Sequence, residues 1–110
     1  MADVGNEVEV KAKKKSWQLE EERDNAELHA VLQEPVGRAV IWRILTECGV
    51  YKSAVGDATD IFRFEGKRDI GLWVMGQVFT SDPKAYTIMR NEADERQSAR
   101  DLAMKGKNNG

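Results

Sequence analysis

The residue types that most often carry catalysis or bind metals are scarce in this sequence. His29 is the only histidine and Cys48 the only cysteine among the 110 residues. Zinc sites draw most of their four ligands from these two types, so we expect no metal site. A single cysteine also excludes an intramolecular disulfide. A nucleophilic pair of Cys48 and His29 is conceivable, but Cys48 recurs with apolar residues at helical spacing, which is typical of a small core residue.

Three glycines, Gly66, Gly71 and Gly76, form the other pattern that bears on cofactor binding. They lack the preceding strand and the spacing of a dinucleotide-binding fingerprint, and the sequence has no phosphate-binding loop of the Walker type. The carboxylates lie in polar, helix-forming segments and do not converge among apolar residues. We therefore predict a protein that is not an enzyme, with no cofactor and no small-molecule substrate.

The composition indicates a neutral globular protein. Hydrophobic residues make up 41% and charged residues 33%, with only two prolines, which fits a compact helical domain. The 17 basic and 19 acidic residues nearly cancel, so no overall field attracts DNA or an anionic membrane. No stretch approaches the roughly 18 apolar residues of a membrane span. The first residues carry no apolar run of the kind found in secretory signals, so we expect a cytoplasmic protein.

The chain divides into two polar ends and one helical domain. Residues 1–16 show no periodicity and are expected to form a flexible arm, because a lysine run is usually solvated. The alternative is an arm that contacts phosphates through its lysines, although three acidic residues just upstream weaken it. The lysines concerned are Lys11, Lys13, Lys14 and Lys15. We place a helical domain at 17–96, with its core in 24–93, and a polar helix end with a loose tail at 97–110.

Capping signals predict the first two helices. Asp24 and Glu27 have the spacing of a capping box, so the first helix is expected to begin near Asp24. Pro35 ends it and suits the first turn of the next helix. That second helix is predicted over 36–48, with one wide apolar face, and Gly49 provides its left-handed cap.

The third helix is predicted to begin at Asp57 or Thr59 and to end near Phe79. It is apolar around most of its circumference, which is typical of a helix in the middle of a bundle. We therefore expect Trp73 to be a core residue whose truncation unfolds the domain. Glycines weaken a helix, so the three glycines are expected to allow close approach of different neighbours. A fourth helix is predicted from Ser81-Asp82-Pro83. The fold is thus all-α, a single compact bundle of three to four helices with disordered polar termini.

Four side chains are candidates for docking a partner: Trp17, Arg38, Trp42 and Arg68. Trp17 either anchors a partner or covers the edge of the core, and the second interpretation is slightly favoured. Arg38 and Trp42 are four residues apart, so the guanidinium is expected to lie over the indole. Arg68 either docks a carboxylate or phosphate, or forms a partly buried ion pair with Glu65, which is the favoured interpretation.

Three blocks of sequence resemble a known family. The segment LQEPVGRAVIWRIL (32–45) resembles the opening motif of a family of small bacteriophage proteins named after a Bordetella phage protein and encoded among head and tail morphogenesis genes. The pattern continues with Gly49-Val50-Tyr51 and FEGKRDIGLW (64–73) and closes with Pro83, Tyr86, Met89 and Glu92. The likeness spans roughly residues 27–93. The lysine arm and the charged end after residue 93 have no counterpart in it.

This resemblance implies a virion-associated or assembly protein with no enzymatic activity. The first hypothesis is an interaction module that binds capsid, portal or internal core proteins in the cytoplasm of the bacterial host, with the virion as an alternative location. A domain this small is marginally stable, so we also expect stabilisation by a partner or by self-association. The alternative is a small nucleic-acid-binding accessory protein that uses the lysine arm with Arg38 and Arg43.

Overall fold

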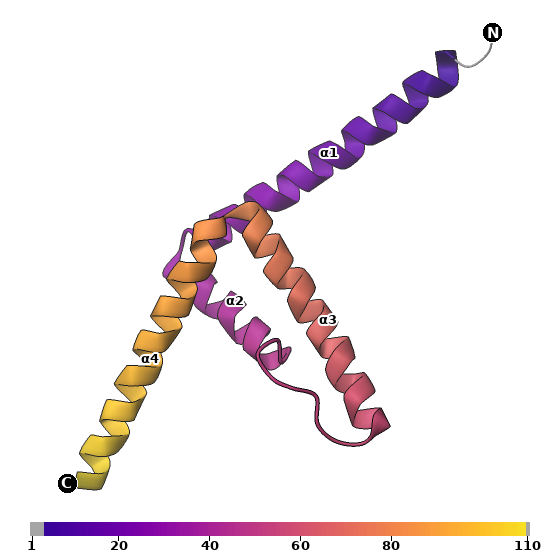
Figure 1. Ribbon diagram of the computed structural model, residues 1–110. Coiled ribbons are helices and arrows are strands. Elements are labelled where there is room, and N and C mark those ends of the chain that lie inside the picture. The colour runs from indigo at the N-terminus through magenta and orange to yellow at the C-terminus, as the bar shows by residue number, and fades with distance from the viewer. Residues whose placement is uncertain (1–3, 110) are drawn as a thin grey trace.

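Four helices account for nearly all of the described chain. The computed structural model describes the backbone of residues 4–109 and the side chains of residues 15–107. In chain order, the helices are α1 (Val4–Leu32), α2 (Pro35–Glu47), α3 (Ala58–Ser81) and α4 (Pro83–Asn109). No strand occurs within residues 4–109. The predicted all-α fold is therefore confirmed, with four helices (Figure 1).

The later helix ends lie where the capping residues place them. Pro35 is the first residue of α2, where its missing N–H leaves no unpaired donor. Gly49 follows that helix with a φ of +71°, the left-handed conformation that glycine adopts without strain. The carboxylate of Asp57 accepts a hydrogen bond from the backbone N–H of Asp60 at 2.9 Å and so caps α3. Pro83 begins α4.

The predicted start of the first helix near Asp24 is wrong. Helix α1 begins at Val4, so Asp24 and Glu27 lie inside it and form no capping box. Residues 4–16, predicted to be a flexible arm, are part of this helix. Alanine, lysine, glutamate and glutamine are strong helix formers, so propensity alone extends the helix well beyond its packed end. Every described side chain from Lys15 to Asp24 is exposed.

The hydrophobic core sits where the four helices meet. Each helix contributes at least one fully buried side chain: Leu32, Leu45, Val78, Ala85 and Met89. A ring of half-buried residues packs around them: Leu28, Ile41, Trp42, Val50, Val74, Met75 and Tyr86. This small core fixes the relative positions of the helices at one junction.

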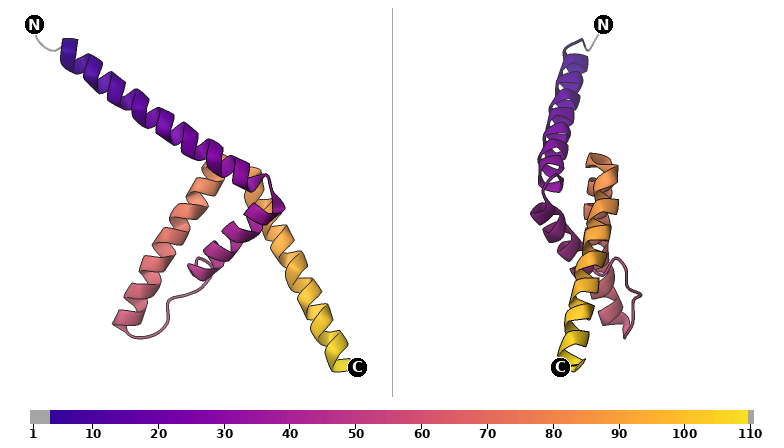
Figure 2. Two further views of the ribbon diagram at one scale, coloured as in Figure 1. Left: turned by 180° about the vertical axis from the view of Figure 1, so that it is seen from behind. Right: turned by 90° about the vertical axis from the view of Figure 1, so that its left-hand side faces the viewer.

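The helices spread from that junction in a flat arrangement. The molecule extends 84 × 39 × 15 Å and has a radius of gyration of 20.7 Å, against about 13 Å for a globular domain of this length. A helix with its side chains is roughly 10–12 Å thick, so the short dimension corresponds to little more than one layer of helices. The N-terminal part of α1 and the C-terminal part of α4 project in different directions (Figures 1 and 2).

The prediction that the third helix occupies the middle of the bundle is wrong. Helix α3 lies at an edge of the layer, with α2 between it and α4 (Figure 1). Of its residues only Gly71 and Val78 are buried, whereas Phe62, Trp73 and Ile70 are 76%, 65% and 61% exposed. Away from the junction, where it contacts α1, α3 has described neighbours on one side only, so its apolar circumference leaves half of its large side chains in water.

The three glycines of α3 also differ from one another. A Cβ atom on Gly71 would lie 2.5 Å from Cys48 Cβ and 2.6 Å from Val50 Cγ1, so this glycine does allow close packing. A Cβ on Gly66 or Gly76 would meet no atom within 4 Å. The expected close neighbours of these two glycines are therefore absent within the described chain.

Candidate interaction surfaces

Arg38 is held by an ion pair that joins α2 to α4. Its Nε donates to Glu92 Oε1 at 2.6 Å and its Nη2 donates to Oε2 at 3.4 Å. Its Nη1 donates to the backbone carbonyl of Leu32 at 2.9 Å, at the end of α1. The hydrogen bond to Glu92 raises the pKa of Arg38. All three guanidinium nitrogens are thus occupied, and the Arg38 side chain is only 13% exposed. In this structure Arg38 fastens three helices together.

The prediction that the Arg38 guanidinium lies over the Trp42 indole is wrong. Trp42 belongs to an aromatic cluster instead. Its ring stacks on Tyr51, with centroids 5.4 Å apart and planes at 27°, and lies 6.2 Å from Tyr86. Phe79 packs against Tyr86 at 5.0 Å. The two tyrosine hydroxyls are 2.8 Å apart and hydrogen bonded, and burial together with this bond raises the pKa of Tyr51. The cluster ties α2 and the loop after it to α3 and α4.

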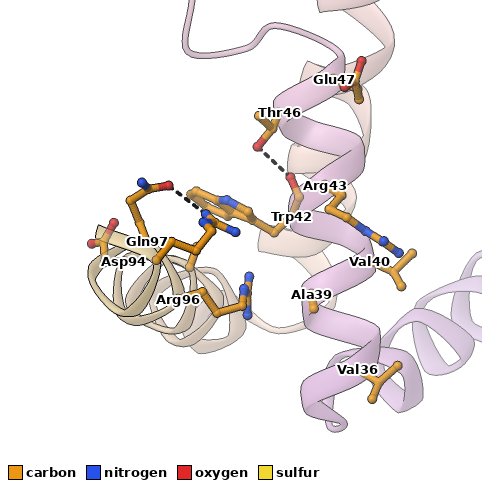
Figure 3. A pocket seen from close by; sticks show the side chains of 12 residues that line it. Val36, Ala39, Val40, Trp42, Arg43, Thr46, Glu47, Asp94, Arg96 and Gln97 are labelled. Atoms are coloured by element: carbon orange, nitrogen blue, oxygen red, sulfur yellow. Dashed lines mark hydrogen bonds between the residues drawn. The ribbon is translucent and has the colours of Figure 1, made fainter. Parts of the chain in front are cut away.

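An open groove lies between α2 and α4. Its volume is about 770 Å³. Figure 3 shows Trp42 reaching from α2 toward α4, where Gln97 lies nearby. Arg43, Arg96 and Arg100 line the groove together with two acidic residues, Glu47 and Asp94. Its other lining residues are Val36, Ala39, Val40, Thr46 and Ala93. The groove therefore combines apolar walls with a small excess of positive charge.

A second surface is the side of α3 that faces away from α2. We call this surface the outer face of α3 and define it by Phe62, Gly66, Asp69, Ile70, Trp73, Gly76 and Thr80, all of which are exposed. At 100° per residue these positions point away from the buried Gly71 and Val78. Its three large side chains are apolar and have no cover within the described chain.

Arg68 and Glu65 are both exposed on α3. The ion pairs of the described side chains do not include one between Glu65 and Arg68. The predicted partly buried pair is therefore wrong, because α3 has no neighbour on that side to bury it. Arg68 stays a candidate for docking a partner.

The projecting half of α1 carries the remaining candidates. Trp17 is 73% exposed, so the prediction that it covers the edge of the core is wrong. Lys15 is exposed on the same helix. Lys11, Lys13 and Lys14 lie in α1, but their side chains are outside the described part of the structure. Because Arg38 is paired with Glu92, the nucleic-acid alternative retains only the lysines and the exposed Arg43.

Two general features of the described residues bear on function. Histidines, cysteines and carboxylates of the described chain form no group of three that could hold a metal ion. None of the described helices is both long and apolar enough to cross a membrane.

The family comparison agrees with the motif blocks and with the core. The family model of Bbp19-like phage proteins matches residues 28–91. The chain belongs to this family. No curated protein and no solved structure shows significant similarity to the chain. The matched region of this Bbp19-like protein starts at Leu28 and contains the helix junction, α2, the aromatic cluster and all of α3. The projecting ends of α1 and α4 lie outside the match.

Sequence reasoning missed the pairing of Tyr51 with Tyr86 and of Arg38 with Glu92. All four residues stand in the family motif blocks, so the motif gave a signal that they matter. Their partners are 35 and 54 positions away, however, and helical spacing relates only residues three or four apart.

Proposed function

We propose that this Bbp19-like protein is a structural or assembly component of a phage particle, without enzymatic activity, which binds capsid, portal or internal core proteins. It acts in the cytoplasm of the bacterial host during assembly. Membership of the phage family supports the biological setting. The proposed role rests on one structural observation, the open groove between α2 and α4, which combines apolar walls with three arginines.

The exposed surface is what an interaction module needs. Monomeric soluble proteins seldom expose contiguous apolar side chains beyond a modest patch, and larger patches mark binding sites. Here the apolar side chains of Val36, Val40 and Trp42 line the groove between α2 and α4, and Val36 is 76% exposed. Tryptophan and arginine are the residue types most enriched at binding hot spots. Both types are present in this groove.

The groove suits a segment of another phage protein that is both apolar and acidic. Its apolar walls would cover aliphatic or aromatic side chains of the segment. Three arginines against two carboxylates leave one net positive charge, and arginine binds carboxylates through two parallel hydrogen bonds. Arg43 is exposed, so replacing it should not disturb the core.

Incorporation into particles is the direct test of the proposed function. We expect mass spectrometry to find the protein at a fixed ratio to the major capsid protein, either in purified virions or in immature heads. Absence from both would contradict the proposal.

A phage that lacks the gene for this protein, complemented with variants of the protein, then tests the groove. Arg43→Glu should reduce incorporation, while Arg63→Glu, an equally drastic change at an exposed arginine of α3, should not. Thermal unfolding of both variants by circular dichroism verifies that they remain folded. Equal incorporation of the two variants would assign the docking to another surface.

A further inference from the structure

The chain exposes more surface than a compact monomer of its mass. Its accessible area is 8728 Å², whereas a monomeric protein of 12.4 kDa exposes about 6,100 Å². The projecting helices account for part of this excess of about 2,600 Å². A stable interface buries roughly 800 Å² from each partner, so the excess is large enough to supply one.

The outer face of α3 contains a stripe with the spacing of a helix–helix contact. Phe62, Gly66, Asp69, Trp73, Gly76 and Thr80 follow one another at intervals of four, three, four, three and four residues. This is the repeat by which two helices pack side by side along a shared seam. Ile70 and Leu72 flank the stripe, and Leu72 is also exposed. The contact pattern is thus present in α3 without a helix to fill it.

Two glycines in the stripe have no close neighbour among the described residues. Open space surrounds the Cβ positions of Gly66 and Gly76, and a glycine in the middle of a helix weakens that helix. A second helix lying on the stripe would come close at both glycines and fill this space. Large aromatic side chains alternate here with glycines, which have no side chain. The protrusions of one helix can therefore fill the gaps of another, as such packing requires.

The positions of the stripe are symmetrical about the level of Gly71, so an antiparallel second copy of α3 brings the same stripe into register. Gly66 and Gly76 are each five residues from Gly71. In an antiparallel pair with its two-fold axis at this level, Gly66 lies opposite Gly76 of the second copy, and Trp73 lies opposite Asp69. Ile70 then meets Ile70 of the second copy beside the axis. An interface of this kind is self-complementary, as two-fold symmetry demands.

Charges on α3 favour its own copy over a strongly charged partner. The helix carries three acidic residues, Asp60, Glu65 and Asp69, and three basic ones, Arg63, Lys67 and Arg68. Two such helices approach with no net repulsion. A nucleic acid would gain nothing from this face, because its binding depends on an excess of positive charge.

The projecting half of α1 extends the same surface. It leaves the junction on the side of α3 opposite to α2, as two views show (Figures 1 and 2). Trp17 precedes Leu28 by eleven residues, so the two lie about 20° apart on the helix and about 16 Å apart along it. Leu28 packs on the core, and Trp17 points the same way beyond the end of α3. A second copy on α3 would come under this tryptophan.

We infer that two copies of this chain pair antiparallel through the outer faces of their α3 helices, with Trp73 at the centre and Trp17 at the rim. The inference does not depend on which virion component the protein binds.

Sedimentation equilibrium of the full chain tests the pairing. We expect a monomer–dimer equilibrium in the wild type. Trp73→Lys should raise the dissociation constant by at least about 30-fold, the effect of losing a central tryptophan hot spot. Leu102→Lys, a matched change at an equally exposed apolar residue of α4, should leave the constant unchanged. A wild type that stays monomeric overturns the inference, and so does a dimer that tolerates Trp73→Lys.

Cysteine cross-linking tests the orientation. In a Cys48→Ser background, Ile70→Cys should form a disulfide-linked dimer on mild oxidation, because the two residues meet beside the axis. Ala99→Cys, exposed on α4, should remain monomeric under the same conditions. Equal cross-linking of both variants, or none at position 70 in a sample that sediments as a dimer, rules out the antiparallel α3 pairing.

Discussion

The helix junction and the outer face of α3 contain similar residues but have different surroundings. At the junction, Leu45, Val78 and Met89 are completely buried. On the outer face, Phe62 and Trp73 are larger and no less apolar, yet most of their surface meets solvent. Burial here depends on where the neighbouring helices lie. The comparison separates residues that make the fold from residues that the fold leaves exposed.

One helix belongs to both regions. Val78 and Gly71 place one side of α3 in the junction, while Trp73 and Phe62 place the opposite side in solvent. A helix that is apolar all round satisfies both requirements. The exposed side adds little to the stability of a single chain, because its apolar side chains stay in water, and we propose that it stabilises an association instead.

The largest expected effect concerns stability, and it sharpens this contrast. Met89→Ala should lower the free energy of unfolding by about 2–5 kcal/mol, because it leaves a cavity at the junction. Trp73→Ala should cost less than about 1 kcal/mol in dilute protein, although it removes the larger side chain. Urea unfolding followed by circular dichroism measures both. The opposite order of the two effects would show that the outer face is part of the core.

The ion pair at the junction provides the next prediction. Arg38→Ala should lower the free energy of unfolding by about 2 kcal/mol, because it leaves Glu92 half-buried without its partner and removes a hydrogen bond to Leu32. Arg38→Lys keeps the charge but not the paired hydrogen bonds, so it should restore only part of the loss. If Arg38→Ala unfolded with the same free energy as the wild type, the ion pair would not stabilise the fold.

The glycines of α3 allow a test within one helix. Gly71→Ala should destabilise the fold by about 1–3 kcal/mol, because the added methyl group overlaps Cys48 and Val50. Gly76→Ala has open space and should stabilise the isolated chain by up to about 1 kcal/mol. In the sedimentation assay, however, Gly76→Ala should weaken the dimer. If it strengthened both folding and pairing, no close helix would lie over that glycine.

The smallest expected effect concerns the dependence of stability on pH in the acid range. Asp82 stands between α3 and α4, and the hydrogen bond from Gln33, aided by the Lys84 N–H and by His29, lowers its pKa below the usual value. A carboxyl with a lowered folded pKa stabilises the fold above its unfolded pKa and loses that contribution as the pH falls through the folded one. Asp82→Asn should therefore melt slightly below the wild type at neutral pH.

The two melting curves should begin to approach each other near pH 3.8, the ordinary pKa of an aspartate, and should converge below the lower pKa that Asp82 has in the fold. Thermal melts of the wild type and of Asp82→Asn across this range test the convergence. A difference that persists in strong acid would show that the carboxylate charge is not its cause.

The sequence predicted the fold class and most helix ends because these depend on local chemistry. Pro35, Gly49, Asp57 and Pro83 act on the residues next to them, and the structure confirms each. The start of α1 was mispredicted because its polar first half has no apolar periodicity to reveal it, whereas helix propensity suffices to extend it.

Neither the position of α3 nor its partners could be predicted in the same way. Periodicity shows that Trp73 and Met89 both lie on apolar faces, but it does not show which faces meet another helix. Arg38 was recognised as a docking candidate, while its partner Glu92 was not, because the pair forms only when α2 and α4 are assembled. Trp17 was expected to cover the core edge, with a partner anchor as the alternative, but it lies about three turns before the last packed turns of α1 and is exposed.

The concentration dependence of unfolding tests the central claim most directly, that α3 folds with one face and associates through the other. Urea unfolding of the wild type over about a hundredfold range of protein concentration should give a midpoint that rises with concentration, since pairing stabilises only the folded state. With Trp73→Lys the midpoint should stay constant. A wild-type midpoint that does not move with concentration would contradict the claim.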